Sequence, residues 1–400
     1  MSWFRSKSLA LAHSQYYAML DNPSSSPSSA LGNNRLLSLD AFRGLTIAGM
    51  ILVNDPGSWA QVYAPLRHAE WNGCTPTDLV FPFFVFIVGV SMYFSLRRFD
   101  HRLSWPTAVK ILRRTLLIFA LGLFLTWFPF YHKPFAEYRI MNVLQRIALA
   151  YGAAAFIGIL TPQRWLWRVI GSILLAYWAL MYFFGGEEPY SLEDNFARMV
   201  DLALLGPSHL YGGFGLPFDP EGLLHSLPAV ATALLGFQAG RLIVETPDRE
   251  RLVRLLLLYG IGGVALGLFW GLGFPINKPL WSSSYVVYTA GLAACLLGVC
   301  MEYYDLYGGK RGKFFLEVFG TNALFAYVLH GLLYKISSYL LAWPSATGDK
   351  THPLAWVYHN LYAQLFGDNP MASLLYAMSY VLLIWGFTYL LYRRKIFIKL

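Results

Sequence analysis

The sequence predicts an all-α integral membrane protein, a polytopic helical bundle of about ten transmembrane helices, with eleven as the alternative count. Of the 400 residues, 56% are hydrophobic and 17% aromatic, whereas only 13% are charged. The mean hydropathy is +0.45. Basic residues border the apolar stretches, so the net charge of +9 is better explained by membrane topology than by nucleic-acid binding.

The predicted helices are apolar stretches long enough to cross a hydrocarbon core of ~30 Å. Six lie in the first 240 residues and four follow after a short basic loop. In chain order they are 36–53, 79–96, 111–128, 143–160, 165–184, 223–240, 255–273, 285–301, 315–334 and 372–392.

Domain organisation is simple. Residues 1–34 contain only a short, interrupted apolar stretch and a Ser/Pro run, which predicts a disordered cytoplasmic segment and not a signal peptide. Residues 35–400 are predicted to form a single transmembrane domain. A long loop at 185–222, rich in Gly, Pro and aromatic residues, is expected to cover the outer face.

Charge distribution predicts the orientation. Most of the 31 Lys and Arg residues lie in or beside the even-numbered loops and at the C-terminus. The positive-inside rule therefore places both termini in the cytoplasm and the odd-numbered loops outside.

The segment around His68 combines a polar loop with the start of an apolar helix. An imidazole can exchange a proton near neutral pH or act as a nucleophile, and it needs a carboxylate or amide to orient it. Trp71, Asn72 and Asp78 follow His68, and Asn54 closes the preceding helix. Asn54 can donate a hydrogen bond to a carbonyl oxygen that develops charge. The alternatives are an incidental loop histidine and an asparagine that only caps its helix.

Charged residues inside the predicted helices cost free energy, so they usually have a partner or a function. Asp40 and Arg43 lie three residues apart, as an ion pair or as part of an anion site. Arg139 and Arg146 are separated by two helical turns, so both could reach one cavity. Gln145 lies beside Arg146, while snorkelling is the alternative for Arg139.

Two further polar clusters fall in odd-numbered loops, on the same side as His68. Asp219 and Glu221 precede a predicted helix and either cap it or bind an amine or hydroxyl group. The other cluster consists of Asn277, Lys278, Trp281, Ser282 and Ser284. His330, on an apolar helix face, is interpreted as a packed residue. The three cysteines fit no metal-ligand spacing, so no metal site is expected.

Together these motifs resemble those of a known family. The segments RLLSLDAFRGLTIAGMILVN, HAEWNGCTPTDLVFPFFVFIVG, RIMNVLQRIALAY, FDPEGLLHSLPAVATALLGFQAG, PINKPLWSSSYV and GTNALFAYVLH occur in one order from residue 35 onward. In this respect the chain is similar to the bacterial, NagX-like relatives of heparan-alpha-glucosaminide N-acetyltransferase, which are multi-pass transmembrane acyltransferases.

The resemblance implies that cytoplasmic acetyl-CoA donates an acetyl group to the amine of a glucosamine-type sugar on the periplasmic side. It assigns catalysis to His68, as acyl carrier or as base, with Asn54 beside it, and cofactor binding to Ser282 and Ser284. CoA is a large anion, so we expect basic side chains to contribute to its site: Arg43, Arg113, Arg114 and Arg146. Expected acceptor-binding residues are Trp71, Asn72, Asp78, Arg139, Gln145, Asp219, Glu221, Asn277, Lys278 and Trp281.

The expected setting is the bacterial inner membrane, and the expected partners are acetyl-CoA, an amino sugar, lipid and a second copy of the chain in a homodimer. The alternative function is a transporter of amino sugars or cell-wall fragments, whose path the intramembrane arginines would line. The two halves of the chain show no internal repeat, which disfavours the transporter. A scaffold without a cofactor would leave the polar clusters without a role.

Overall fold

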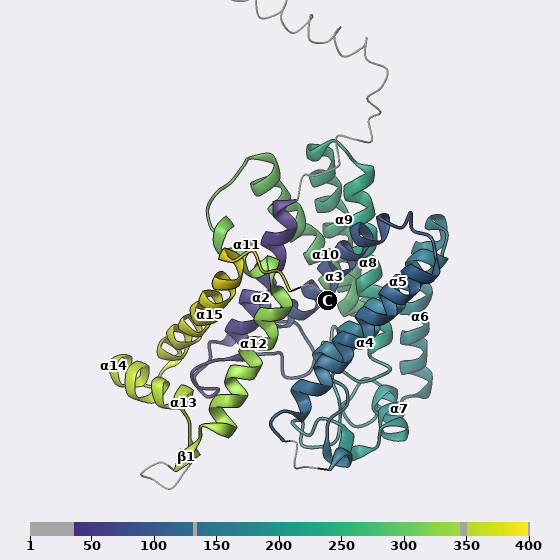
Figure 1. Cartoon of the computed structure of the whole chain (residues 1–400). Coiled ribbons are helices and arrows are strands. Elements are labelled where there is room, and N and C mark those ends of the chain that lie inside the picture. The colour runs from purple at the N-terminus through teal and green to yellow at the C-terminus, as the bar shows by residue number, and fades with distance from the viewer. Residues whose placement is uncertain (1–35, 131–133, 345–349, 399–400) are drawn as a thin grey trace, which may run out of the picture. The chain divides into compact units, whose positions relative to one another are not determined.

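A computed structural model describes residues 36–130, 134–344 and 350–398, and most of them lie in helices (Figure 1). The segment predicted to be disordered, 1–34, lies outside the described residues. The α-helices, labelled as in Figure 1, are α2 (Leu37–Asn54), α3 (Pro76–Arg97), α4 (Trp105–Trp127), α5 (Val143–Leu160), α6 (Leu166–Phe184), α7 (Phe196–Leu204), α8 (Ser226–Glu245), α9 (Arg249–Trp270), α10 (Ser283–Cys300), α11 (Lys313–Thr321), α12 (Ala323–Lys335), α13 (Pro353–Val357), α14 (Gln364–Phe366) and α15 (Pro370–Arg393).

Short elements connect these helices. The 3₁₀ turns are η2 (Ala64–Leu66), η3 (Phe135–Glu137), η4 (Gln163–Trp165) and η5 (Pro207–His209). The π-helical turns are η6 (Met301–Leu306), η7 (Ile336–Leu340) and η8 (Tyr358–Ala363). A two-residue antiparallel ladder joins β1 (Trp343–Pro344) to β2 (Lys350–Thr351), with Trp343 opposite Thr351. The loop at 185–222 contains α7 and η5.

The all-helical, multi-pass architecture is confirmed. In the described part of the chain, eight helices are long and apolar enough to cross a membrane, and a bent pair makes a ninth candidate. Within these residues the structure thus supports eight or nine candidate spans, against the ten predicted. The stretch 111–128 forms the long helix α4, but Lys110, Arg113 and Arg114 place three charges in it, and it is not among the eight.

The predicted helix 315–334 is broken in two. α11 and α12 meet at Asn322 with a bend of 81°. The Asn322 amide donates to the Ile396 carbonyl at 3.1 Å and accepts from the Ile398 amide at 2.9 Å. The side chain therefore holds the backbone of the C-terminal segment at the break, an interaction that hydropathy alone does not predict.

Close packing of α3 against α8 positions the site. A Cβ added to Gly89 would lie 2.0 Å from the Ala233 carbonyl oxygen, and one added to Gly236 would lie 1.9 Å from that of Phe86. Only glycine permits the two backbones to approach this closely. The pair fixes the N-terminal end of α3, which carries Asp78, relative to that of α8, which follows Glu221.

One end of the bundle gathers the loops that carry most of the predicted site. The Gly73 amide donates to the Ile276 carbonyl at 2.7 Å, and the Ile140 amide donates to that of His209 at 3.2 Å. These bonds join the loops before α3 and α10, and the loop before α5 with that before α8. We call this end, which also includes the C-terminal end of α2, the His68 end.

Candidate functional site

Asp78 organises the loop that carries His68. Thr75 caps α3, and Asp78, three residues on, completes a capping box with it. One Asp78 oxygen accepts from the Ala69 amide, the Thr75 amide and the Thr75 hydroxyl, each at 3.0 Å. The other lies 2.6 Å from Nδ1 of His68. The same carboxylate thus folds the loop and holds the imidazole.

The two members of this pair differ in exposure. The His68 side chain is 48% exposed, whereas that of Asp78 is 1% exposed. A carboxylate only accepts hydrogen bonds, so the contact with Asp78 favours the tautomer that carries its proton on Nδ1. Nε2 of the exposed ring is then the nitrogen that can take up a proton or attack a carbonyl carbon.

Lys278 brings a positive charge to the same carboxylate. Its Nζ lies 3.0 Å from Nδ1 of His68 and 3.4 Å from Asp78 Oδ1. Burial lowers the pKa of Lys278, against the opposing influence of the carboxylates of Asp78 and Glu221. The side-chain amide of the neighbouring Asn277 donates to Asn72 Oδ1 at 3.1 Å. This bond ties the Lys278 loop to the His68 loop.

A second charged cluster lies where the loop before α5 meets the loop before α8. Arg139 binds Asp219 in a bidentate arrangement at 2.7 and 2.8 Å and Glu221 at 2.5 Å. Its pKa is raised because, despite burial, both carboxylates stabilise the charged guanidinium. Arg146 donates to the Pro220 carbonyl at 2.5 Å and lies over the Trp281 ring. We call Arg139, Asp219 and Glu221 the Arg139 cluster.

The two arginines meet for a different reason from the one predicted. Helix α5 begins at Val143, so Arg139 lies before the helix and the two-turn helical spacing does not apply. Both guanidiniums instead reach the segment from Asp219 to Glu221. Beneath it, Asp201 is fully buried, and burial together with the charge of Asp219 raises its pKa to about 7.

The residues at the start of α10 use their polar atoms internally. Ser282 caps the helix, accepts from the backbone amide of Asn277 and donates to the Pro275 carbonyl at 2.8 Å. Ser284 donates to the Phe274 carbonyl at 2.5 Å. Both serines are fully buried. In this structure they hold the corner between α9 and α10, and their predicted contact with a cofactor stays a prediction.

Trp281 fills the space behind this corner. It is fully buried in the left-handed backbone region, at a φ of 49°. Its indole nitrogen donates to the Thr232 hydroxyl at 3.1 Å, and its ring makes an edge contact with Phe81. Trp71 has a similar structural bond, since its indole donates to the Tyr190 carbonyl at 2.9 Å.

Three of the four arginines predicted to bind the cofactor, Arg43, Arg113 and Arg114, lie away from the His68 end, whereas Arg146 lies at it. Arg43 and Asn54 belong to the same helix and stand roughly 17 Å apart along its axis. Arg43 contacts Asp40, the Gly320 carbonyl and, at 2.6 Å, Ser91. Arg113 is exposed in the N-terminal half of α4, and Arg114 lies over the Tyr151 ring.

Two predicted residues stand apart from these networks. Asn54 is the exposed last residue of α2, and it directly precedes Asp55, which contacts His330 at 3.0 Å. Gln145 is fully buried beside Gly122, and neither polar atom of its side chain has a partner in the described part of the chain.

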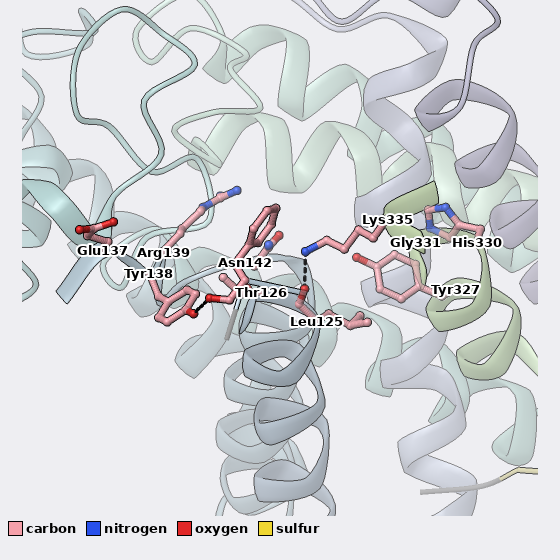
Figure 2. A pocket seen from close by; sticks show the side chains of 11 residues that line it. Leu125, Thr126, Glu137, Tyr138, Arg139, Asn142, Tyr327, His330, Gly331 and Lys335 are labelled. Carbon is pink, nitrogen blue, oxygen red and sulfur yellow. Dashed lines mark hydrogen bonds between the residues drawn. The ribbon is translucent and has the colours of Figure 1, made fainter. Parts of the chain in front are cut away.

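A cavity of about 340 Å³ shows what sequence reasoning missed. Tyr327 and Lys335 were given no role, and His330 was interpreted only as packed, yet all three line it with Arg139 (Figure 2). No spacing could reveal the cavity, because its walls come from α4, the loop before α5 and α12. The full lining is Leu125, Thr126, Phe130, Glu137, Tyr138, Arg139, Asn142, Tyr327, His330, Gly331 and Lys335.

Comparison with known proteins agrees with the sequence motifs. A family model described as heparan-alpha-glucosaminide N-acetyltransferase, catalytic, matches residues 35–262. The heparan-alpha-glucosaminide N-acetyltransferase of Homo sapiens is 28% identical over an alignment of 424 positions, which includes 92% of this chain and 60% of the human protein. That of Mus musculus is 27% identical over an alignment of 425 positions, which includes 92% of this chain and 61% of the mouse protein.

The chain therefore spans about 60% of the length of the curated relatives it matches. His68, Asp78 and the Arg139 cluster all lie inside the segment matched by the family model, whereas Lys278 and His330 lie beyond it. The resemblance drawn from the sequence is confirmed: this multi-pass membrane protein belongs to the heparan-alpha-glucosaminide N-acetyltransferase catalytic family.

Proposed function

We propose that the protein is a transmembrane N-acetyltransferase that transfers an acetyl group from cytoplasmic acetyl-CoA to the amine of a glucosamine-type sugar on the periplasmic side. The observation that carries the proposal is the His68–Asp78 pair. It lies within the segment matched by the family, with an exposed imidazole on a buried carboxylate. A ring oriented in this way is equipped for acyl-transfer chemistry.

Two reaction schemes use the same geometry. In the first, Nε2 of His68 takes a proton from the sugar amine while the amine nitrogen attacks the thioester carbonyl carbon. The tetrahedral intermediate collapses with loss of the CoA thiolate, which leaves an amide. In the second, Nε2 itself attacks the thioester and expels the thiolate. The amine then attacks the carbonyl carbon of the acetyl-imidazole, the amine proton passes to Nε2 as the C–N bond to the ring breaks, and an amide is formed. In both schemes Asp78 stabilises the positive charge that develops on the imidazole.

Residues near the His68–Asp78 pair have proposed roles of their own. Lys278 interacts with the Asp78 carboxylate and fixes the loop opposite His68. Asn54 is proposed to donate to the oxyanion. Trp71 and Asn72, which are predicted to bind the acceptor, follow His68 in the same loop.

The donor is proposed to approach from the opposite end of the bundle. Arg43, Arg113 and Arg114 lie toward the N-terminal ends of α2 and α4, far from the His68 end, and would attract the phosphates of CoA. The pantetheine arm would then extend along the bundle toward His68, near Arg146 and the corner of Ser282 and Ser284.

We propose a bacterial cytoplasmic membrane as the location and a homodimer as the assembly. Cross-linking in native membranes tests the homodimer.

The test is acetyl transfer by the purified full-length chain. Protein in detergent is incubated with acetyl-labelled acetyl-CoA and glucosamine, and labelled N-acetylglucosamine is quantified for wild type, His68→Ala and His359→Ala. His359 is an exposed histidine outside the proposed site, so His359→Ala is the matched control. The proposal expects activity in wild type and the control only. Equal activity in His68→Ala would contradict it. Absence of transfer with sugar uptake into proteoliposomes would support the transporter instead.

A further inference from the structure

The cavity of about 340 Å³ lies at the His68 end of the bundle, at Arg139 of the Arg139 cluster. Its walls are the C-terminal end of α4, the loop before α5 and the middle of α12, and His68 is not among the residues that line it (Figure 2). Its volume lies at the lower end of the ~300–1,000 Å³ range of small-molecule sites, which suits one monosaccharide ring and not a nucleotide cofactor.

A buried imidazole–carboxylate pair forms one wall. Nδ1 of His330 lies 3.0 Å from Asp55 Oδ2, and the side chains are 10% and 8% exposed. The Tyr380 hydroxyl donates to the His330 carbonyl at 2.7 Å and fixes the backbone. The Tyr327 ring packs 5.3 Å from the imidazole. Within the described residues, neither Nε2 of His330 nor the Tyr327 hydroxyl has a hydrogen-bond partner. Both remain available to a ligand.

Charged side chains from α12 and the loop before α5 line the rest of the cavity. Lys335 donates to the carbonyls of Leu125 and Phe128 at 2.5 and 2.9 Å, where the C-terminal end of the α4 dipole is negative. Arg139 is held by both carboxylates of its cluster. Glu137 and Asp55 add two carboxylates, but Arg146 and Lys278 also act on Glu221, so the charges in and beside the wall are close to balanced. The surroundings therefore suit a neutral, hydroxyl-rich ring, and the amine of the ligand follows from the proposed function.

The cavity is electrostatically linked to the His68 site. Arg139 lines the cavity, and its partner Glu221 interacts with the charge of Lys278, which contacts His68. Glu221 and Lys278 thus connect the cavity, through Arg139, with the proposed reacting imidazole.

We propose that this cavity binds the amine-bearing sugar ring of the acceptor, with His330 and Tyr327 as hydrogen-bonding residues for its hydroxyl groups. The proposal deepens the proposed function and rests on it for the identity of the ligand as acceptor. Asp55 is a positioning residue, because it orients the His330 ring and leaves Nε2 for the ligand. Aromatic rings of Tyr138 and Tyr327 would cover the apolar face of the sugar.

The experiment compares His330→Gln and Tyr327→Phe with His359→Gln, an exposed histidine outside the cavity. Glucosamine binding to the purified full-length chain is measured by titration calorimetry, and KM is measured separately for glucosamine and acetyl-CoA. Each cavity variant should weaken glucosamine binding by about tenfold, equivalent to the loss of one hydrogen bond. KM for acetyl-CoA and all constants of His359→Gln should stay at wild-type values. Tyr327→Phe keeps the ring and its packing, so it serves if His330→Gln fails to fold.

Outcomes separate this site from the proposed function. If the wild-type protein binds glucosamine and both cavity variants lose this binding, the site is supported. This holds even if no acetyl group is transferred, in which case only the proposed function fails. Wild-type transfer with unchanged glucosamine KM in both cavity variants overturns the site. Binding of glucose as tight as that of glucosamine overturns the preference for an amine.

Discussion

The pairs His68–Asp78 and His330–Asp55 both join an imidazole nitrogen to a carboxylate near the His68 end, but they are built differently. His68 and Asp78 are ten residues apart in one loop and helix start, and the ring is half exposed. His330 and Asp55 are 275 residues apart on different helices, and both are buried. An exposed ring can meet two substrates in turn, whereas a buried ring against a cavity is suited to holding one.

The largest expected effect separates the two pairs by kinetics. His68→Gln should lower kcat for acetyl transfer by about 10²–10⁴-fold, the usual contribution of a positioned acid–base group. His330→Gln should keep kcat within about threefold and act on the KM for the acceptor. Steady-state rates at saturating glucosamine measure the difference. If His330→Gln shows the larger fall in kcat, the assignment of the two roles is reversed.

The Arg139 cluster, which links the two regions, should give the next largest effect. Arg139→Gln leaves Asp219 and Glu221 buried without their shared cation, and breaking a buried pair costs about 3–5 kcal/mol of unfolding free energy. Arg241→Gln is the matched control, since its partner Glu245 is 53% exposed and the pair is worth under about 1 kcal/mol. Denaturant unfolding in detergent would show equal losses for the two variants if the cluster were not stabilising.

Asp201 is a buried carboxylate that, unlike Asp78 and Asp55, has no imidazole partner among the described residues. Burial, and then the charge of Asp219, raise the pKa of Asp201 to about 7. Between about pH 4 and 7 the folded chain keeps a proton that the unfolded chain has lost, so this group lowers stability as pH rises through that window. Asp201→Asn removes the dependence. From about pH 5 to pH 8, its stability relative to wild type should rise by about 2 kcal/mol.

Thermal unfolding at several pH values tests this prediction. Asn at position 201 can still accept from the Leu223 amide, which lies 2.9 Å from Asp201 Oδ1. A difference between variant and wild type that stays constant with pH would show that Asp201 does not titrate in that window.

The smallest effect compares the two carboxylates. Asp78 accepts from two backbone amides and a hydroxyl besides His68, whereas Asp55 contacts the His330 ring. An amide at position 78 turns one acceptor into a donor that faces other donors. Asp78→Asn should therefore lose about 1 kcal/mol more stability than Asp55→Asn, the value of a helix cap. Equal melting temperatures would indicate that the capping box contributes nothing.

Residue chemistry and family motifs pointed to His68 and to the neighbouring Asp78, but Asp78 was predicted to bind the acceptor, and its contact with the imidazole appears only in the structure. Nothing in the sequence indicated the second pair. Hydropathy predicted nearly every long helix, but it could not foresee the break at Asn322, where a side chain binds the backbone of the chain's last residues. The His330 cavity depends on contacts between α2, α4 and α12, which only the folded chain brings together.

The central claim is that the His68 imidazole performs the chemistry, and chemical rescue tests it most directly. The His68 side chain is half exposed, so free imidazole can enter the space it leaves in His68→Ala. Acetyl transfer from acetyl-CoA to glucosamine is measured with and without added imidazole. The account predicts a nearly inactive variant whose rate rises with imidazole concentration, while wild type is unaffected. A variant as active as wild type without imidazole would contradict it.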